Sequence, residues 1–120
     1  MRIKIFFLLP LFSFALATNA QIKWPAITKT MKPWTRWWWE GSAVNKADLT
    51  WNLQQYQKAG LGGVEITPIY GVSGSEKQFV DFLSPQWMQM LMHTLNESKR
   101  LGLGVDLANA TGWPFGGPWT

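Results

Sequence analysis

The chain has 120 residues, a formal net charge of +4, nine tryptophans and no cysteine. The lack of cysteine excludes disulfides and thiolate metal sites, so the fold must depend on a hydrophobic core. Its basic residues are interspersed with acidic ones and form no basic stripe, which argues against a nucleic-acid partner.

Residues 1–20, MRIKIFFLLPLFSFALATNA, are typical of a secretory signal peptide. Arg2 and Lys4 are followed by an apolar run and then by small residues, so cleavage is expected before Gln21. The apolar run is shorter than the roughly 20 residues that a membrane helix needs. We therefore predict a secreted or periplasmic protein that has no membrane contact after cleavage.

The first part of the mature chain is rich in tryptophan. Residues 21–34 contain two prolines and no sustained periodicity, which predicts an extended lead-in segment. Thr35–Glu40 is a short aromatic run closed by Gly41, and this pattern is typical of a strand.

A helix is predicted over residues 46–59. Asn45 is a suitable N-cap, and Asp48 three residues later can bond back to the free amides. Apolar residues recur at helical spacing at Leu49, Leu53 and Tyr56. The segment therefore has one apolar face and a defined start.

A second strand and a second helix follow. Val64–Thr67 alternates apolar and polar residues, and Pro68 is expected to end this strand. Residues 72–83 form a longer connection, after which Ser84 and Pro85 begin a helix as N-cap and first residue. Its predicted packing side consists of Trp87, Leu91, Thr94, Leu95 and Ser98.

A third strand is predicted over residues 103–110, before a Gly- and Pro-rich tail. The order strand–helix–strand–helix–strand implies parallel strands with right-handed crossovers. A doubly wound sheet usually has a Gly-rich phosphate turn after its first strand, which EGSAVNK lacks. We therefore favour an α/β fold: the first three strands and two helices of a truncated (β/α)₈ (TIM-type) barrel over residues 35–120. A small self-sufficient domain is the alternative.

Strand alternation separates two sets of side chains. Trp37 and Trp39 are expected to pack beneath the helices, as are Val64, Ile66, Val105 and Leu107. The opposite face is expected to carry Arg36, Trp38, Glu40, Glu65, Thr67 and Asp106. Because an unpaired buried charge is costly, Arg36 should contact Glu65 or Asp106.

Barrel enzymes bind substrate at the carboxyl ends of their strands. Glu40, Tyr70 and residues 109–113 lie at these ends. Tryptophan suits the apolar face of a sugar ring, and amides and carboxylates suit its hydroxyls, which predicts a carbohydrate partner. His93, alone in the middle of a helix, is expected to serve helix packing or the surface.

The segments RWWWEG and TGWPFGGPW carry a resemblance. From about Lys32 to Trp119, the chain resembles the N-terminal part of the catalytic region of family 106 glycoside hydrolases, the bacterial α-L-rhamnosidases. The resemblance implies a barrel within a much longer chain, and inverting hydrolysis of terminal α-L-rhamnose from plant polysaccharides or glycosides. It also implies that Ca²⁺ assists the full-length protein, while no cofactor or metal ligand is expected in these residues.

Inversion needs an acid and a base roughly 6.5–9.5 Å apart. In the family both are glutamates of later strands, so no catalytic residue is expected before Thr120. The resemblance carries over only part of the sugar-binding mouth, namely Trp38, Glu40, Asn109, Thr111 and Trp113. A carbohydrate-binding module without catalysis and a small structural exported protein are the alternatives.

Overall fold

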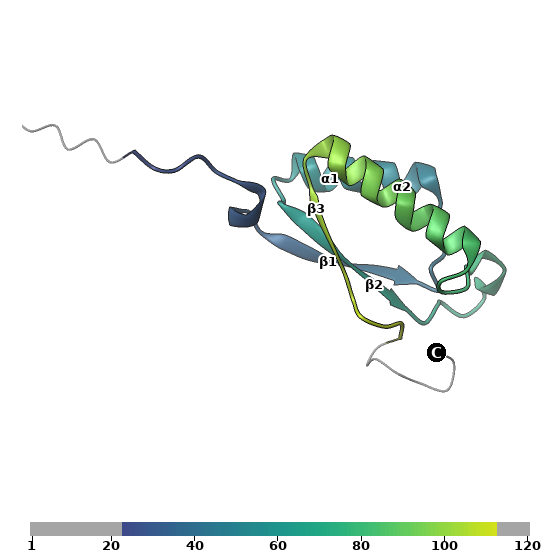
Figure 1. Cartoon of the computed structure of the whole chain (residues 1–120). Helices are drawn as coiled ribbons and strands as arrows, with labels where there is room; N and C mark the ends of the chain where they lie inside the picture. Colours follow the sequence, from purple (N-terminus) through teal and green to yellow (C-terminus); the bar gives the residue numbers. More distant parts are fainter. Residues whose placement is uncertain (1–22, 113–120) are drawn as a thin grey trace, which may run out of the picture.

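The computed structural model describes residues 23–112, so the predicted signal peptide lies outside the described residues. Within this range three parallel strands form one sheet in the order β1-β2-β3, with two α-helices between them (Figure 1). The strands are β1 (Trp34–Glu40), β2 (Gly63–Ile69) and β3 (Gly104–Leu107), and the helices are α1 (Lys46–Lys58) and α2 (Pro85–Leu101). Two short 3-10 helices are η1 (Lys29–Met31) and η2 (Glu76–Gln78).

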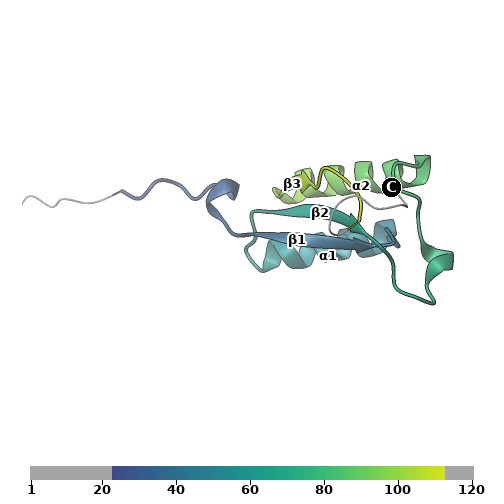
Figure 2. The same ribbon diagram turned by 90° about the horizontal axis from the view of Figure 1, so that it is seen from below.

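Both helices lie on the same face of the sheet, as two perpendicular views show (Figure 1 and Figure 2). A doubly wound sheet reverses its strand order and carries helices on both faces. Sequential strands with helices on one face are the arrangement of part of a barrel. The described chain is therefore a small α/β unit of three parallel strands and two helices, consistent with a partial barrel.

Both helices begin where the sequence predicts. Oδ1 of Asn45 accepts a hydrogen bond from the N–H of Asp48 at 3.0 Å, and Oγ of Ser84 accepts one from the N–H of Trp87 at 3.2 Å. Such a cap stabilises a helix by about 1 kcal/mol. Gly102 ends α2 in the left-handed conformation (φ 71°), as helix-terminating glycines commonly do.

The hydrophobic core lies between the sheet and the helices. Its fully buried side chains include Trp39, Leu53, Val64, Ile66 and Trp87. The rings of Trp39 and Trp87 meet edge to face with their centroids 5.8 Å apart. Trp37 is 8% exposed, so the prediction that Trp37 and Trp39 pack beneath the helices is confirmed.

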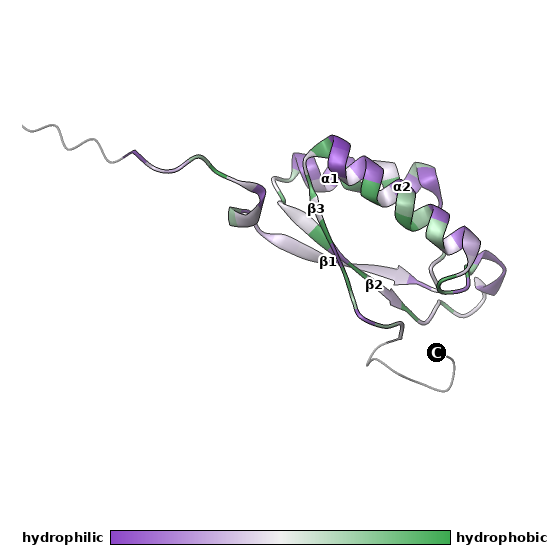
Figure 3. Ribbon diagram, viewed as in Figure 1, coloured by the Kyte–Doolittle hydropathy of each residue, from purple (hydrophilic) through white to green (hydrophobic). Residues whose placement is uncertain are grey.

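The packing side of α2 differs from the prediction at two positions, Leu95 and Met90. Its buried residues are Trp87, Met90, Thr94 and Ser98. Leu95 is 38% exposed, so its assignment to this side is wrong. Met90 shares the face because it lies three residues after Trp87 and four before Thr94. Hydrophobic and hydrophilic residues are interspersed along α2 (Figure 3).

Leu107 is also more exposed than predicted. Val105 is partly buried, but Leu107, on the same face of β3, is 40% exposed. β3 is an edge strand, and the described residues contain no helix after it. The outer part of its helix-facing side therefore has no helix over it within residues 23–112.

Pro68 was predicted to end β2, but the strand continues to Ile69. The carbonyl oxygens of Ile66 and Pro68 both point toward β3, where they accept hydrogen bonds from the N–H groups of Ala108 and Gly112 at 2.9 and 3.0 Å. β3 itself ends at residue 107, so its ladder requires no donor at Pro68. A proline is tolerated at such a position because its missing N–H leaves no partner unpaired.

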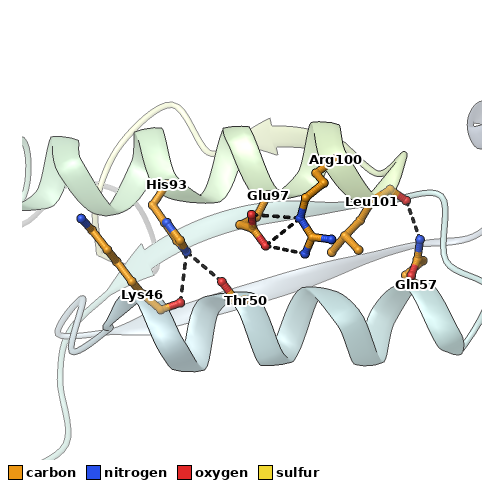
Figure 4. Close-up of polar contacts among 7 residues, drawn as sticks. All are labelled: Lys46, Thr50, Gln57, His93, Glu97, Arg100 and Leu101. Atoms are coloured by element: carbon orange, nitrogen blue, oxygen red, sulfur yellow. Dashed lines mark hydrogen bonds and ion pairs between the residues drawn. The ribbon is translucent and has the colours of Figure 1, made fainter.

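Polar contacts join α1 and α2 at their surface (Figure 4). Nε2 of His93 lies 2.9 Å from Oγ1 of Thr50 and 3.1 Å from the carbonyl oxygen of Lys46. Since a carbonyl oxygen only accepts, we assign the ring proton to Nε2. Nε2 of Gln57 donates to the carbonyl oxygen of Leu101 at 2.9 Å, which satisfies one of the last carbonyls of α2. The predicted role of His93 in helix packing is confirmed.

Candidate functional site

The sheet face that points away from the helices carries the predicted site. The register aligns three rows across it: Trp34 with Gly63 and Gly104, Arg36 with Glu65 and Asp106, and Trp38 with Thr67. Aligned residues of neighbouring strands are close enough for their side chains to interact. The predicted division of β1 into two faces is therefore confirmed.

Arg36 forms an ion pair with Glu65, one of its two predicted partners. Nε of Arg36 donates to Oε2 of Glu65 at 3.3 Å, and Nη2 lies 3.2 Å from the same oxygen. The two side chains are 38% and 36% exposed, so the prediction of a buried cation is wrong. At these exposures such a pair contributes only about 0–1 kcal/mol.

Arg36 also contacts Trp38, two residues further along β1. Its Cζ atom lies 5.3 Å from the centroid of the Trp38 ring, which is within the range of a cation–π interaction. Trp38 is 41% exposed. An exposed indole on a strand is a suitable surface for the apolar face of a sugar ring.

Glu40 is the last residue of β1, and it is exposed. The next residue, Gly41, has a left-handed backbone (φ 58°), a conformation that favours glycine. Its N–H donates to the carbonyl oxygen of Ile69 at 2.9 Å, which joins the carboxyl ends of β1 and β2. The carboxylate of Glu40 is thus presented at this end of the sheet, where it can accept hydrogen bonds from hydroxyl groups.

Phe79 packs across these strand ends, and sequence reasoning missed it. A side chain at either Gly41 or Gly71 would overlap the ring of Phe79. The N–H of Val80 donates to the carbonyl oxygen of Gly41 at 3.0 Å, which holds this segment against the turn after β1. Glycines shortly after two neighbouring strands were the signal for a bulky group at that place.

The predicted site residues after β3 lie on a turn that returns to β2. Oγ1 of Thr111 lies 3.5 Å from the carbonyl oxygen of Pro68, and the N–H of Gly112 donates to the same oxygen at 3.0 Å. Asn109 is exposed, whereas Thr111 is partly buried. Trp113, the fifth predicted site residue, lies outside the described residues.

A groove of about 430 Å³ lies beside β1, the first half of α1 and the segment 72–79. It brings together Trp38 and Glu40, but its lining does not include Asn109 or Thr111. Its other lining residues with aromatic or polar side chains are Trp37, Trp39, Asp48, Trp51, Asn52, Ser75, Gln78 and Phe79. Its size and its mixture of aromatic and polar groups are suitable for a small ligand such as a sugar.

Three carboxyl or phenol groups have displaced pKa values. The N–H of Gly74 donates to Glu76 at 2.9 Å and lowers the pKa of its carboxyl group. On α2, the hydrogen bond from Arg100 lowers the pKa of Glu97. Burial raises the pKa of the Tyr56 phenol. Each shift favours the charge state that the group has at neutral pH.

The described residues do not fit a metal site. Among residues 23–112, no three His, Cys, Asp or Glu side chains lie close enough together to hold a metal ion. Residues 23–112 therefore contain no carboxylate cluster for the calcium ion that the resemblance implies. In the same range, no helix combines the length and the apolar character needed to span a bilayer.

Comparison with known proteins decides the family. A model of glycoside hydrolase family 106, the α-L-rhamnosidases, matches residues 26–120, which is most of the chain. The chain belongs to this family. The resemblance found in the sequence is thereby confirmed.

Two individual proteins are similar to this family member. A protein of Formosa agariphila named as a β-glucuronidase is 31% identical over 87 residues, which are 71% of this chain and 7% of that protein. The rhamnosidase of Novosphingobium sp. PP1Y has a similar fold, with a TM-score of 0.60 and 21% identity over 76% of this chain and 9% of that chain. The chain thus spans less than a tenth of the length of either protein.

Proposed function

We propose that this chain forms part of the sugar-binding mouth of an α-L-rhamnosidase, within the first strands of a (β/α)₈ barrel. One observation carries the proposal: in a chain of this family, Trp38 and Glu40 line the same groove at the carboxyl end of β1. The exposed indole provides a surface for the apolar face of the sugar, and the carboxylate accepts hydrogen bonds from its hydroxyls.

The chemistry is proposed to be inverting hydrolysis of terminal α-L-rhamnose in plant polysaccharides or glycosides. This reaction requires one carboxylic acid and one carboxylate on opposite sides of the scissile bond. Glu65 is engaged by Arg36, so we do not assign it to either role. The catalytic glutamates are placed outside these 120 residues, and the chain alone is expected to bind sugar without hydrolysing it.

Export is part of the proposal because residues 1–20 have the pattern of a signal peptide. A secreted or periplasmic enzyme would meet plant-derived glycosides directly. The calcium ion that the resemblance implies for the full-length protein is assigned to residues outside this range, since residues 23–112 contain no cluster of three His, Cys, Asp or Glu side chains.

A second candidate substrate comes from the relative in Formosa agariphila, which is named as a β-glucuronidase. A β-D-glucuronide carries a carboxylate where a rhamnoside carries a methyl group. The family match favours the rhamnoside.

A sugar titration tests the proposal. Saturation-transfer NMR is recorded on the chain with methyl α-L-rhamnoside and, separately, with methyl β-D-glucuronide. Transfer to the rhamnoside is expected, together with no release of nitrophenol from an aryl α-L-rhamnoside. Transfer to the glucuronide alone would mean that the site binds β-D-glucuronides and not rhamnosides. Transfer to neither sugar would refute a sugar-binding mouth in these residues.

The non-catalytic alternative of a β-rich carbohydrate-binding module has no support in the architecture. Such modules are commonly β-sandwiches, whereas the described chain has two capped α-helices over a parallel sheet. The matched family is one of hydrolases.

A further inference from the structure

Three side chains on the open face of the sheet form a chain of contacts. Glu65 lies beside Arg36 in the register of β1 and β2, and Trp38 follows two residues after Arg36. Nε of Arg36 lies 3.3 Å from Oε2 of Glu65, and Nη2 lies 3.5 and 3.2 Å from Oε1 and Oε2. Cζ of Arg36 lies 5.3 Å from the centroid of the Trp38 ring. One guanidinium group therefore contacts a carboxylate and an indole.

The planar geometry of the guanidinium group allows the contact with Glu65 to orient Arg36 and, through it, the Trp38 ring. The group is planar and carries N–H donors in a fixed fork, so two nitrogens on one carboxylate define the orientation of its plane. Glu65 thereby fixes the position of the positive charge beside β1. An indole on a strand can in general adopt several staggered side-chain conformations. Attraction between its ring and a fixed cation favours the one conformation that keeps them in contact.

We propose that Arg36 is a positioning residue, which together with Glu65 holds the Trp38 indole in the orientation used for stacking on a sugar. Only the use of this orientation rests on the proposed function. The orientation itself is a property of the chain that can be measured without sugar. Arg36 acts through Trp38 and does not touch the sugar.

The first measurement follows the indole signals of the chain labelled with ¹⁵N-tryptophan. Nine tryptophans give nine indole N–H signals in the full chain, and Trp38→Phe identifies the signal of Trp38 by its loss. In Arg36→Met, which keeps the aliphatic stem but removes the charge, the Trp38 signal is expected to shift and broaden. Glu65→Gln is expected to change the same signal in the same direction, because it weakens the hold on Arg36.

Arg36→Lys separates positioning from a general effect of charge. Lysine keeps the cation but lacks the planar fork. The Trp38 signal of this variant is expected to remain displaced from that of the wild type. Recovery of the wild-type signal by lysine would overturn the role given to the Arg36–Glu65 contact.

The second measurement is the affinity for methyl α-L-rhamnoside. Arg36→Met is expected to weaken binding by about two- to fivefold, the range of an exposed cation–π contact. In the Trp38→Ala background the same substitution is expected to have no further effect, because Arg36 acts only through the indole. An additional loss in that background would mean that Arg36 touches the sugar, and it would overturn the proposal.

Failure of this inference and failure of the proposed function are distinguishable. An unchanged Trp38 signal in both Arg36→Met and Glu65→Gln overturns the positioning role, whatever the affinity for sugar. If the Trp38 signal is displaced in Arg36→Met and Glu65→Gln but the wild-type chain binds no rhamnoside, Arg36 and Glu65 do orient the indole. That result would overturn only the proposal that the indole stacks on a sugar. If all indole signals of Arg36→Met move, that variant has changed its fold, and Glu65→Gln decides between these outcomes.

Discussion

The indole of Trp34 extends across β2 and covers Gly104 on β3. Both residues belong to the first row of the sheet register, with Gly63 between them. A Cβ atom at Gly63 would lie 2.7 Å from the Trp34 ring, and one at Gly104 would overlap it. Nε1 of Trp34 donates to the carbonyl oxygen of Lys29 at 3.2 Å, which ties the ring to η1. One side chain thus closes the amino-terminal end of the open face, opposite the end that carries Trp38 and Glu40.

Gly104→Ala is predicted to destabilise the chain because its methyl group would collide with Trp34. The nearest atoms to a Cβ at this position all belong to the Trp34 side chain. Overpacking of this kind costs typically about 1–3 kcal/mol in the free energy of unfolding. Urea denaturation followed by circular dichroism measures it as a lower midpoint.

The matched control is the same substitution in a Trp34→Ala background. With the ring removed, Gly104→Ala should be neutral or stabilising by about 0.4–1 kcal/mol, because it restricts only the unfolded chain. An equal loss of stability in both backgrounds would contradict the contact between Trp34 and Gly104.

Two buried serines should respond differently to alanine. Oγ of Ser42 accepts a hydrogen bond from Nε1 of Trp87 at 3.0 Å, whereas Oγ of Ser98 makes no hydrogen bond within the described residues. Ser42→Ala leaves a buried N–H without an acceptor and should cost about 1–3 kcal/mol. Ser98→Ala should be neutral or stabilising. The urea denaturation midpoints of the two variants measure these effects. A larger loss of stability for Ser98→Ala than for Ser42→Ala would show that the hydrogen-bond assignment is wrong.

Ser84→Ala is predicted to lower the free energy of unfolding by about 1 kcal/mol, since it removes the N-cap of α2. Ser75 provides the control, because it precedes η2 and its side chain makes no capping hydrogen bond. Ser75→Ala should leave the thermal midpoint unchanged. Equal shifts for both variants would indicate that the Ser84 cap does not contribute to stability.

Glu97 gives the chain a defined response to acid. Its hydrogen bond to Arg100 lowers its pKa below the ordinary value of 4.5. Its contribution to stability is therefore fully present above pH 4.5, and it is lost as the pH falls through the lowered folded-state value. Arg100→Gln should raise the pKa of Glu97 and reduce this acid-dependent loss.

An NMR titration of the glutamate side chains measures this shift. Glu76 is the internal control, because the N–H of Gly74 lowers its pKa independently of Arg100. The pKa of Glu76 should stay constant in Arg100→Gln. A constant pKa for Glu97 as well would mean that Arg100 does not stabilise its carboxylate.

Local signals in the sequence predicted most of the fold. Asn45 and Ser84 defined the helix starts because capping depends on residues within one turn. Alternation along the strands assigned the two faces of β1 and limited the expected partners of Arg36 to Glu65 and Asp106. The errors arose where residues distant in the sequence determine the end of an element. Pro68 remains within β2 because the ladder of β3 ends beside it.

The candidate site was less accessible to sequence reasoning. Trp38 and Glu40 share a groove because both lie on one strand, whereas Asn109 and Thr111 follow a turn whose path depends on the carbonyl of Pro68. Phe79 joins the site from a connection without periodicity. The two glycines indicated space for a bulky group, but only the folded structure shows that Phe79 fills it.

The central claim, that Trp38 forms part of a sugar-binding mouth, is tested most directly by calorimetric titration of methyl α-L-rhamnoside. Trp38→Ala is predicted to weaken binding about tenfold through loss of the stacking surface. Trp24→Ala is the control, because Trp24 is 86% exposed and lies in the lead-in segment away from the groove. Weaker binding by Trp38→Ala with unchanged binding by Trp24→Ala is the predicted result, and equal affinity of Trp38→Ala and the wild type would contradict the account.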